Sequence, residues 1–141
     1  MKKEFIFGVI GAGNGGKAMT AYLALLGKKV LLYNRTFSHV EVIAERQGID
    51  LINSDGLEGF GRLDKVTDNI AEFLAETQVI MVVTPSTAHR DIAIAATPYL
   101  RDDHKVILHP GRTGGALEFA ETLRQNGCAT TPIISEAETF I

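Results

Sequence analysis

The chain has 141 residues, with 14 Lys and Arg against 17 Asp and Glu, so its formal net charge is −3 at pH 7. Hydrophobic residues make up 45% and charged residues 22%, which is the composition of a globular chain of about one domain and not of a disordered one. The acidic balance argues against a nucleic-acid partner, and every uncharged apolar stretch is far shorter than the roughly 20 residues that a membrane span needs.

Two apolar segments joined by a helical one open the chain. Residues 5–10 are almost continuously hydrophobic, which is typical of a strand buried on both faces. A glycine-rich turn then leads to a helix predicted over residues 17–26 and ended by Gly27, and a second strand follows over residues 29–33. The short connections predict a βαβ unit with a right-handed crossover. The apolar stripe of this helix is expected to comprise Ala18, Ala21, Tyr22, Leu25 and Leu26.

The next part of the chain predicts a helix and an insertion. Residues 38–47 form the helix, ended by Gly48, with Val40, Ile43 and Ala44 facing the sheet. Three glycines lie among apolar residues in 49–63, which favours a short β-hairpin insertion with a glycine-containing turn. Asp68 is expected to cap a short helix that runs to residue 74.

The second half of the chain repeats the alternation of strands and helices. Ser86 is the expected N-cap of a helix that runs to about residue 99, with Pro98 distorting its last turn. The other predicted elements are strands at 79–83, 105–108 and 131–134 and a helix at 116–125. This alternation predicts an α/β fold in which residues 1–141 form a doubly wound parallel Rossmann sheet, with strand order 3-2-1-4-5-6.

The glycine-rich turn carries the strongest functional signal. It reads G-x-G-x-x-G directly after the first strand and opens the first helix, and its residues are Gly11, Gly13, Asn14, Gly15 and Gly16. The first glycine permits the tight turn, the second lets the backbone approach a pyrophosphate, and the last allows the helix to pack closely on the strand. The helix amides then face the anion. The sequence therefore predicts dinucleotide binding, against the alternative of a turn that only joins strand to helix.

The end of the second strand indicates the cofactor. An acidic residue there would bind the ribose hydroxyls of NAD, but this chain has Asn34, Arg35 and Thr36. A guanidinium can make a bidentate, charge-assisted contact with a 2′-phosphate. We therefore expect NADP to be preferred, with NAD possible if Arg35 is solvated or stacks on adenine.

Two more turns follow strands at the edge where ligands of such sheets bind. Thr84 and Pro85 follow the central strand, and a second glycine-rich turn contains Gly111, Arg112, Thr113 and Gly114. Both turns either border a ligand or simply end their strands. The four histidines have no metal-ligand spacing, and no metal site is expected. His109 follows a strand on the ligand side, but no carboxylate near it in sequence would orient it for acid and base catalysis.

Cysteine usage and the N-terminus indicate a compartment. Cys128 is the single cysteine and cannot form an internal disulfide, and the first residues contain no signal-peptide pattern. We expect a cytoplasmic protein. The apolar ending of the chain, directly after a predicted strand, leads us to expect a second domain that is absent here.

Three segments resemble a known family. The turn at 11–16, the run at 21–27 and the segment 110–118 are together similar to the N-terminal domain of octopine and nopaline (opine) dehydrogenases. The resemblance implies that NAD(P)H reduces the imine formed between an amino acid and an α-keto acid. It implies that residues 11–16 contact the pyrophosphate, that residues 34–36 contact the ribose, and that Thr84 and Pro85 lie near the nicotinamide. It also implies that the turn at 111–114 borders the substrate cleft and that the catalytic residues lie in a helical C-terminal domain.

Two alternatives stay open. One is the cofactor domain of a glycerol-3-phosphate or ketopantoate-type reductase, which shares the first glycine-rich motif. The other is a non-catalytic, nucleotide-sensing Rossmann module. With no acid and base pair identified in its sequence, the chain on its own is expected to bind its cofactor without turnover.

Overall fold

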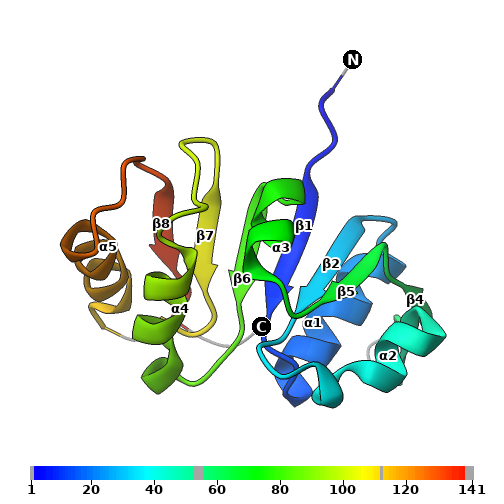
Figure 1. The fold of residues 1–141 in the computed structure, drawn as a ribbon. Helices are drawn as coiled ribbons and strands as arrows, with labels where there is room; N and C mark the ends of the chain where they lie inside the picture. The colour runs from blue at the N-terminus through cyan, green and yellow to red at the C-terminus, as the bar shows by residue number, and fades with distance from the viewer. Residues whose placement is uncertain (1, 53–55, 112, 139–141) are drawn as a thin grey trace.

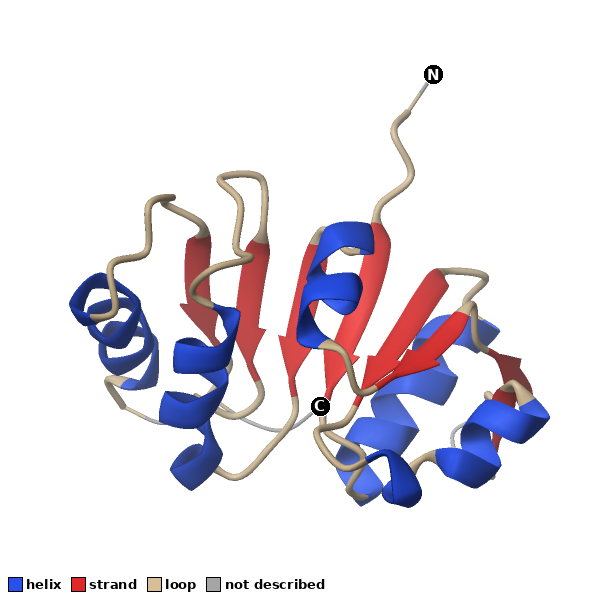
Figure 2. Ribbon diagram, in the orientation of Figure 1, coloured by secondary structure: helices blue, strands red, loops and turns tan. Residues whose placement is uncertain are grey.

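The computed structural model describes residues 2–52, 56–111 and 113–138. Helices lie on both sides of a main sheet of six strands (Figure 2). The elements are β1 (Ile6–Ile10), α1 (Asn14–Leu25), β2 (Lys29–Tyr33), η1 (Phe37–His39), α2 (Glu41–Arg46), β3 (Gly48–Leu51), β4 (Gly59–Arg62), β5 (Lys65–Thr67), α3 (Ile70–Glu76), β6 (Val79–Val82), η2 (Ser86–Ala88), α4 (His89–Ala96), β7 (Lys105–Leu108), α5 (Gly115–Gln125) and β8 (Ile133–Glu136).

The main sheet has the order β5-β2-β1-β6-β7-β8, and all its neighbouring strands are parallel. When its six strands are numbered along the chain, this order is 3-2-1-4-5-6, so the predicted doubly wound sheet is confirmed. The direction of winding reverses between β1 and β6, where Phe7 pairs with Val79 and Ile10 with Val82. Such a reversal opens a crevice at the carboxyl ends of the strands, which is where ligands bind in folds of this kind.

Helices cover both faces of the sheet (Figure 1). Helices α3, α4 and α5 lie on one face, and α1, α2 and the β3–β4 hairpin lie on the other. Alternate residues of β2 enter opposite layers: Leu31 packs in the core under α3 to α5, whereas Val30 and Leu32 pack in the core under α1. Because both faces are buried, nearly every position of the central strands is apolar, which explains their almost continuous hydrophobic runs.

The predicted hairpin insertion is confirmed by β3 and β4, which pair antiparallel with Gly48 opposite Arg62. The hairpin packs on α1 so closely that a Cβ on Gly61 would lie 2.9 Å from the carbonyl oxygen of Ala21. The third strand of the main sheet is β5, which the sequence did not predict. It has three residues, and its neighbour Asp64 accepts a 2.9 Å hydrogen bond from the amide of Val30 on β2.

The predicted apolar stripe of α1 is largely wrong. Ala21 is buried, but Tyr22 and Leu26 are 43% and 49% exposed. The buried residues of α1 are Gly16, Met19, Thr20, Ala21 and Leu23. The helix begins at Asn14, three residues before the predicted start, and its small residues allow it to lie close to the sheet. Packing distance at the glycine turn, and not side-chain size, therefore decides which face is buried.

Several predicted helix ends also differ. Gln47, with φ of 55°, is the left-handed C-cap of α2, and Gly48 already begins β3. Asn69, not Asp68, caps α3 by accepting a 3.1 Å hydrogen bond from the amide of Glu72. Helix α4 ends at Ala96, before Pro98, because a proline inside a helix lacks the required N–H donor.

Ser86 does not serve as the predicted N-cap. It is the first residue of η2, and no side chain caps either η2 or α4.

None of the described helices is long and apolar enough to cross a membrane.

Candidate functional site

The turn between β1 and α1 is built around two glycines that no other residue can replace without movement. Gly11 has φ of +113°, and a Cβ on it would lie 2.3 Å from the carbonyl oxygen of Val83 after β6. A Cβ on Gly16 would lie 1.9 Å from the carbonyl oxygen of Gly11. The absence of a Cβ at these two positions lets α1 lie directly against the end of β1 and next to β6. The turn therefore sits at the crevice where the sheet reverses its winding.

Gly13 has a different surrounding. A Cβ built on it would meet no atom within 4 Å, and its φ of −71° is open to any residue. Neither backbone strain nor packing among the described residues therefore requires glycine here. What glycine leaves at this position is open space over the backbone, which is the condition for a ligand to approach the turn.

Among the described residues, no acidic side chain caps the N-terminus of α1. Gly13 is the N-cap, no side chain caps the helix, and its first turn contains no acidic residue. The first hydrogen bond of the helix runs from the amide of Lys17 to the carbonyl oxygen of Gly13. The preceding amides point out of the helix end, where the macrodipole favours negative charge. This end of α1 is suited to bind a phosphate group.

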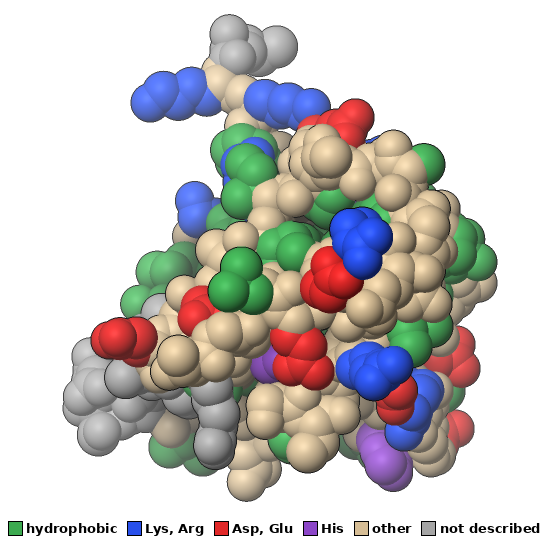
Figure 3. Space-filling model, turned by 90° about the vertical axis from the view of Figure 1, so that its left-hand side faces the viewer, with side chains coloured by type: hydrophobic (Ala, Val, Ile, Leu, Met, Phe, Trp, Pro, Cys, Tyr) green, Lys and Arg blue, Asp and Glu red, His purple; other side chains and the backbone are tan. Residues whose placement is uncertain are grey.

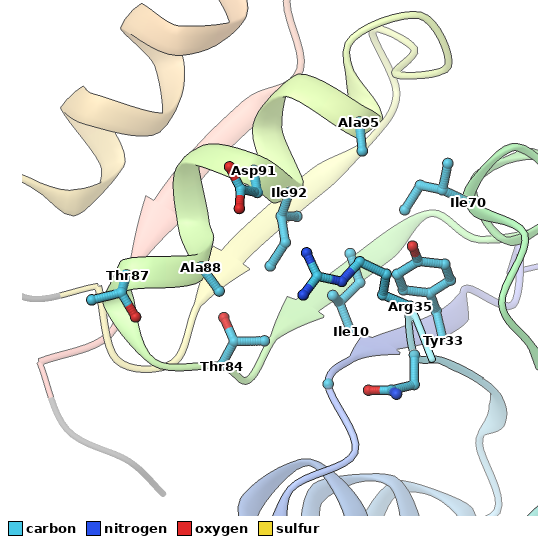
Figure 4. A pocket seen from close by; sticks show the side chains of 12 residues that line it. Ile10, Tyr33, Arg35, Ile70, Thr84, Thr87, Ala88, Asp91, Ile92 and Ala95 are labelled. Carbon is cyan, nitrogen blue, oxygen red and sulfur yellow. The ribbon is translucent and has the colours of Figure 1, made fainter. Parts of the chain in front are cut away.

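A cavity of about 570 Å³ opens beside the turn, between the carboxyl ends of β1 and β2 on one side and α4 on the other (Figure 4). Most of its walls are apolar, with polar atoms at a few points. The lining residues are Ile10, Gly11, Tyr33, Asn34, Arg35, Ile70, Thr84, Thr87, Ala88, Asp91, Ile92 and Ala95. A mainly apolar cavity with a few polar groups is the usual form of a cofactor site.

Four of the residues predicted for the cofactor line this cavity: Gly11, Asn34, Arg35 and Thr84. The guanidinium of Arg35 projects into the cavity between Tyr33 and Ile92 (Figure 4). Burial raises the pKa of the Tyr33 hydroxyl, a shift that the charge of Arg35 opposes. A neutral phenol and a cation therefore share this wall of the cavity.

The other predicted cofactor residues lie around the cavity and do not line it. Gly13, Asn14, Gly15 and Gly16 form the turn and the start of α1, as described above. The carbonyl oxygen of Thr36 accepts a 2.8 Å hydrogen bond from the side-chain amide of Asn34, which shapes the turn after β2. Pro85 is the exposed N-cap of η2 and directly follows the cavity residue Thr84.

The second glycine-rich turn packs against the end of β8. Gly111 is buried, its amide donates a 3.2 Å hydrogen bond to the carbonyl oxygen of Ala137, and a Cβ on it would lie 2.1 Å from Cβ of Glu136. Gly114 caps α5 with φ of 85°, and Thr113 is exposed. Arg112 lies outside the described residues. The described residues of this turn are not part of the cavity wall.

Two buried histidines lie at the same edge of the sheet as the cavity. His109 follows β7 and His89 begins α4, and both are 3% exposed. Among the described residues, no partner reaches either ring nitrogen of His109, Nε2 of His89 or the hydroxyl of Thr84. Burial lowers the pKa of both histidines.

His104 has a different, structural role at the opposite edge. Its Nδ1 accepts a 2.8 Å hydrogen bond from the amide of Arg101, which places the proton on Nε2. That nitrogen donates to the carbonyl oxygens of Leu74 and Thr77, each at 3.0 Å, at the C-terminal end of α3. In the part of the chain that the structure describes, no three His, Cys, Asp or Glu side chains gather as a metal site would require.

The sequence prediction missed the wall of the cavity. Tyr33, Ile70, Asp91 and Ile92 line it but were not predicted. A signal existed for the α4 side, because residues spaced by three and four positions after Ser86 share one helix face. For Tyr33 and Ile70 there was none, because their meeting depends on how α3 packs against β2.

Comparison with known proteins defines the class of this chain. The family described as "NAD-dependent glycerol-3-phosphate dehydrogenase N-terminus" matches residues 7–131, and the chain belongs to this family of nucleotide-binding domains. Within it, the chain is 38% identical over 127 residues to the opine dehydrogenase of Arthrobacter sp. (strain 1C), an alignment that covers 90% of this chain and 35% of that protein. The predicted resemblance to the N-terminal domain of opine dehydrogenases is confirmed.

Solved structures show the same fold. An octopine dehydrogenase described with NADH and L-arginine superposes with a TM-score of 0.74 and 18% identity, over 89% of this chain and 33% of that one. A yersinopine dehydrogenase described with NADP⁺ superposes with a TM-score of 0.71 and 19% identity, over 94% of this chain and 34% of that one. The chain thus spans about a third of the length of these relatives.

Proposed function

We propose that the chain is the NAD(P)H-binding domain of an opine-type dehydrogenase, an oxidoreductase that joins an amino acid to an α-keto acid. The observation that carries this proposal is the combination at one crevice of an open glycine turn, a helix N-terminus that no described acidic side chain caps, and a largely apolar cavity. The 38% identity to an opine dehydrogenase supports this choice of reaction.

Each part of the site has a separate task in this proposal. The turn at Gly11, Gly13, Asn14, Gly15 and Gly16 holds the pyrophosphate with backbone amides. Asn34, Arg35 and Thr36 bind the adenosine ribose, and the cation of Arg35 favours NADP over NAD. Thr84 and Pro85 lie towards the nicotinamide. Relatives described with NADH and with NADP⁺ are consistent with either cofactor.

The proposed chemistry is shared between cofactor and protein. When bound, the reduced cofactor supplies hydride for an imine carbon. The residues of this chain bind and orient the cofactor, and the turn that includes Gly111, Arg112, Thr113 and Gly114 borders the substrate. The catalytic acid and base belong, in this proposal, to a helical domain that follows residues 1–141. The 141-residue chain then binds cofactor without turnover, and its proposed location is the cytoplasm.

The family match favours one alternative. The description of the matching family names glycerol-3-phosphate dehydrogenase. In this alternative the chain is the cofactor domain of a reductase with a phosphorylated three-carbon substrate. Both readings require the same cofactor site. They differ in the complete enzyme: NAD(P)H oxidation that requires both an amino acid and an α-keto acid supports the opine reaction, whereas oxidation-reduction of glycerol 3-phosphate supports the alternative.

The direct test is a titration of the 141-residue chain with NADH and with NADPH. Calorimetry and cofactor fluorescence measure the binding. We expect saturable binding of both, with NADPH bound more tightly. Failure of both cofactors to bind would refute the proposal. The same chain mixed with an amino acid, an α-keto acid and NADPH is expected to show no oxidation of cofactor, and turnover would contradict the assignment of catalysis to another domain.

A further inference from the structure

Helix α4 presents one face to the cavity, and this face carries a single charge. Ala88, Asp91, Ile92 and Ala95 line the cavity at intervals of three and four residues, which places them on one side of the helical segment. Three of the four are apolar. Asp91 is exposed and lies in the first turn of α4. Water solvates this exposed carboxylate, so a ligand that covers it must put a hydrogen-bond donor in place of that water.

The protein does not supply that donor within the described residues. Arg35 lies on the opposite wall of the cavity (Figure 4), but it forms no ion pair with Asp91 at 4.0 Å or less. No described side chain or backbone amide donates a hydrogen bond to the Asp91 carboxylate. The two residues thus line one cavity from its two sides.

The part of a dinucleotide that binds Asp91 must carry a hydrogen-bond donor and no negative charge. Phosphate oxygens would be repelled by the carboxylate, and the turn at Gly11 and the N-terminus of α1 already suit them. The ribose is assigned above to the residues after β2. What remains is the base, whose flat faces suit the apolar walls formed by Ile70, Ile92 and Tyr33. Adenine carries an amino group on its edge, and this group is a hydrogen-bond donor.

We propose that Asp91 is a specificity-determining residue that accepts a hydrogen bond from the 6-amino group of adenine and thereby selects adenine over 6-oxopurines. This inference rests on the proposed function as a dinucleotide-binding domain. An ionised carboxylate accepts hydrogen bonds and cannot donate one. A purine with oxygen at position 6 would place an acceptor against it, so the hydrogen bond is lost and the two oxygens repel. A site built for a donor rejects analogues that lack it.

The test compares NADH with its reduced nicotinamide hypoxanthine analogue, which differs only in the oxygen at position 6 and the hydrogen this places on N1. Dissociation constants of the 141-residue chain are measured by cofactor fluorescence. For the unsubstituted chain we expect NADH to bind roughly tenfold more tightly or better, as the loss of a charge-assisted hydrogen bond predicts. Asp91→Ala is expected to bring the two constants to within about twofold. Asp91→Asn, which can also donate, is expected to favour the hypoxanthine analogue relative to the unsubstituted chain.

Glu45→Gln is the matched control, because Glu45 is exposed on α2 and does not line the cavity. We expect this variant to keep the preference of the unsubstituted chain for NADH. Thermal melting confirms that each variant is folded. Equal affinity of the unsubstituted chain for the two dinucleotides, or a preference for NADH that survives Asp91→Ala, would overturn the inference alone. If neither dinucleotide binds, the proposed function fails and the inference with it.

Discussion

Oε2 of Glu136, at the end of β8, accepts a 2.6 Å hydrogen bond from the backbone amide of Ala116, in the first turn of α5. The carboxylate therefore occupies the N-terminus of α5, where the helix dipole favours negative charge. In the part of the chain that the structure describes, no carboxylate caps the N-terminus of α1 in this way. Of the two glycine-rich turns, the first thus leaves its helix end available to a ligand anion, whereas the second has its helix end filled by the protein.

Removal of this carboxylate should destabilise the fold. Glu136→Ala leaves the exposed amide of Ala116 to water, and we expect the free energy of unfolding to fall by about 0.5–1.5 kcal/mol. Urea denaturation measures the change. Glu136→Gln keeps a neutral acceptor and should lose less, and Glu138→Ala, at an exposed carboxylate nearby, should have little effect. Equal stability of Glu136→Ala and the unsubstituted chain would show that the contact contributes nothing in solution.

The first glycine turn offers a pair of substitutions with opposite outcomes. Gly16→Ala forces a Cβ to within 1.9 Å of the carbonyl oxygen of Gly11, so we expect a loss of roughly 1–3 kcal/mol of stability or more, because the atom it meets is backbone. Gly13→Ala meets open space and should leave the melting temperature unchanged or raised. Its methyl group would occupy the proposed pyrophosphate position, so NADH affinity should fall.

Thermal melting and NADH titration of both variants separate fold from binding. A Gly13→Ala variant that binds NADH as tightly as the unsubstituted chain would exclude the proposed position of the pyrophosphate. A Gly16→Ala variant with an unchanged melting temperature would contradict the close contact between α1 and β1.

Arg35 provides the test of cofactor choice. Arg35→Ala removes a cation that projects into the cavity, and we expect a loss of about 1–3 kcal/mol in NADPH affinity with little change for NADH. Calorimetric titration with the two cofactors measures both values on the same preparation. If NADPH and NADH are weakened equally, Arg35 does not contact the 2′-phosphate, and stacking on adenine becomes the better account.

Acid should weaken the fold through three buried histidines. Burial is the main cause that lowers the pKa values of His89, His104 and His109, and for His104 the charge of Arg101 lowers it further. In the unfolded chain these groups bind protons near pH 6.5, but in the folded chain they resist protonation. The unfolded state therefore binds more protons as the pH falls below about 6.5, and the free energy of unfolding decreases.

Urea denaturation at pH 8, 7, 6 and 5.5 measures this effect. Stability should be nearly constant from pH 8 to 7 and fall below about pH 6.5, before the carboxylates begin to titrate. Constant stability down to pH 5.5 would show that the three histidines accept protons in the folded state as readily as in the unfolded one.

Sequence patterns predicted most of the elements because their signals are local. The continuous apolar runs of β1, β2 and β6 arise from burial on both faces, and the spacing of glycines at 11, 13 and 16 arises from contacts within one turn. Strand β5 was missed because three residues are too short for a periodic pattern, and its place is set by pairing with β2. The stripe of α1 was misplaced because the close approach of Gly16 to β1 sets the rotation of the helix.

The sequence by itself determined the alternating parallel fold and the glycine turn, since hydrophobic period and backbone freedom are properties of neighbouring residues. Only the tertiary structure decided which groups share the cavity. Arg35 and Asp91 lie 56 positions apart in the chain and line one cavity because β1 lies between β2 and β6, and α4 follows β6. The structure likewise decided that Glu136 fills the N-terminus of α5, because parallel pairing of β7 and β8 brings together groups that no local pattern relates.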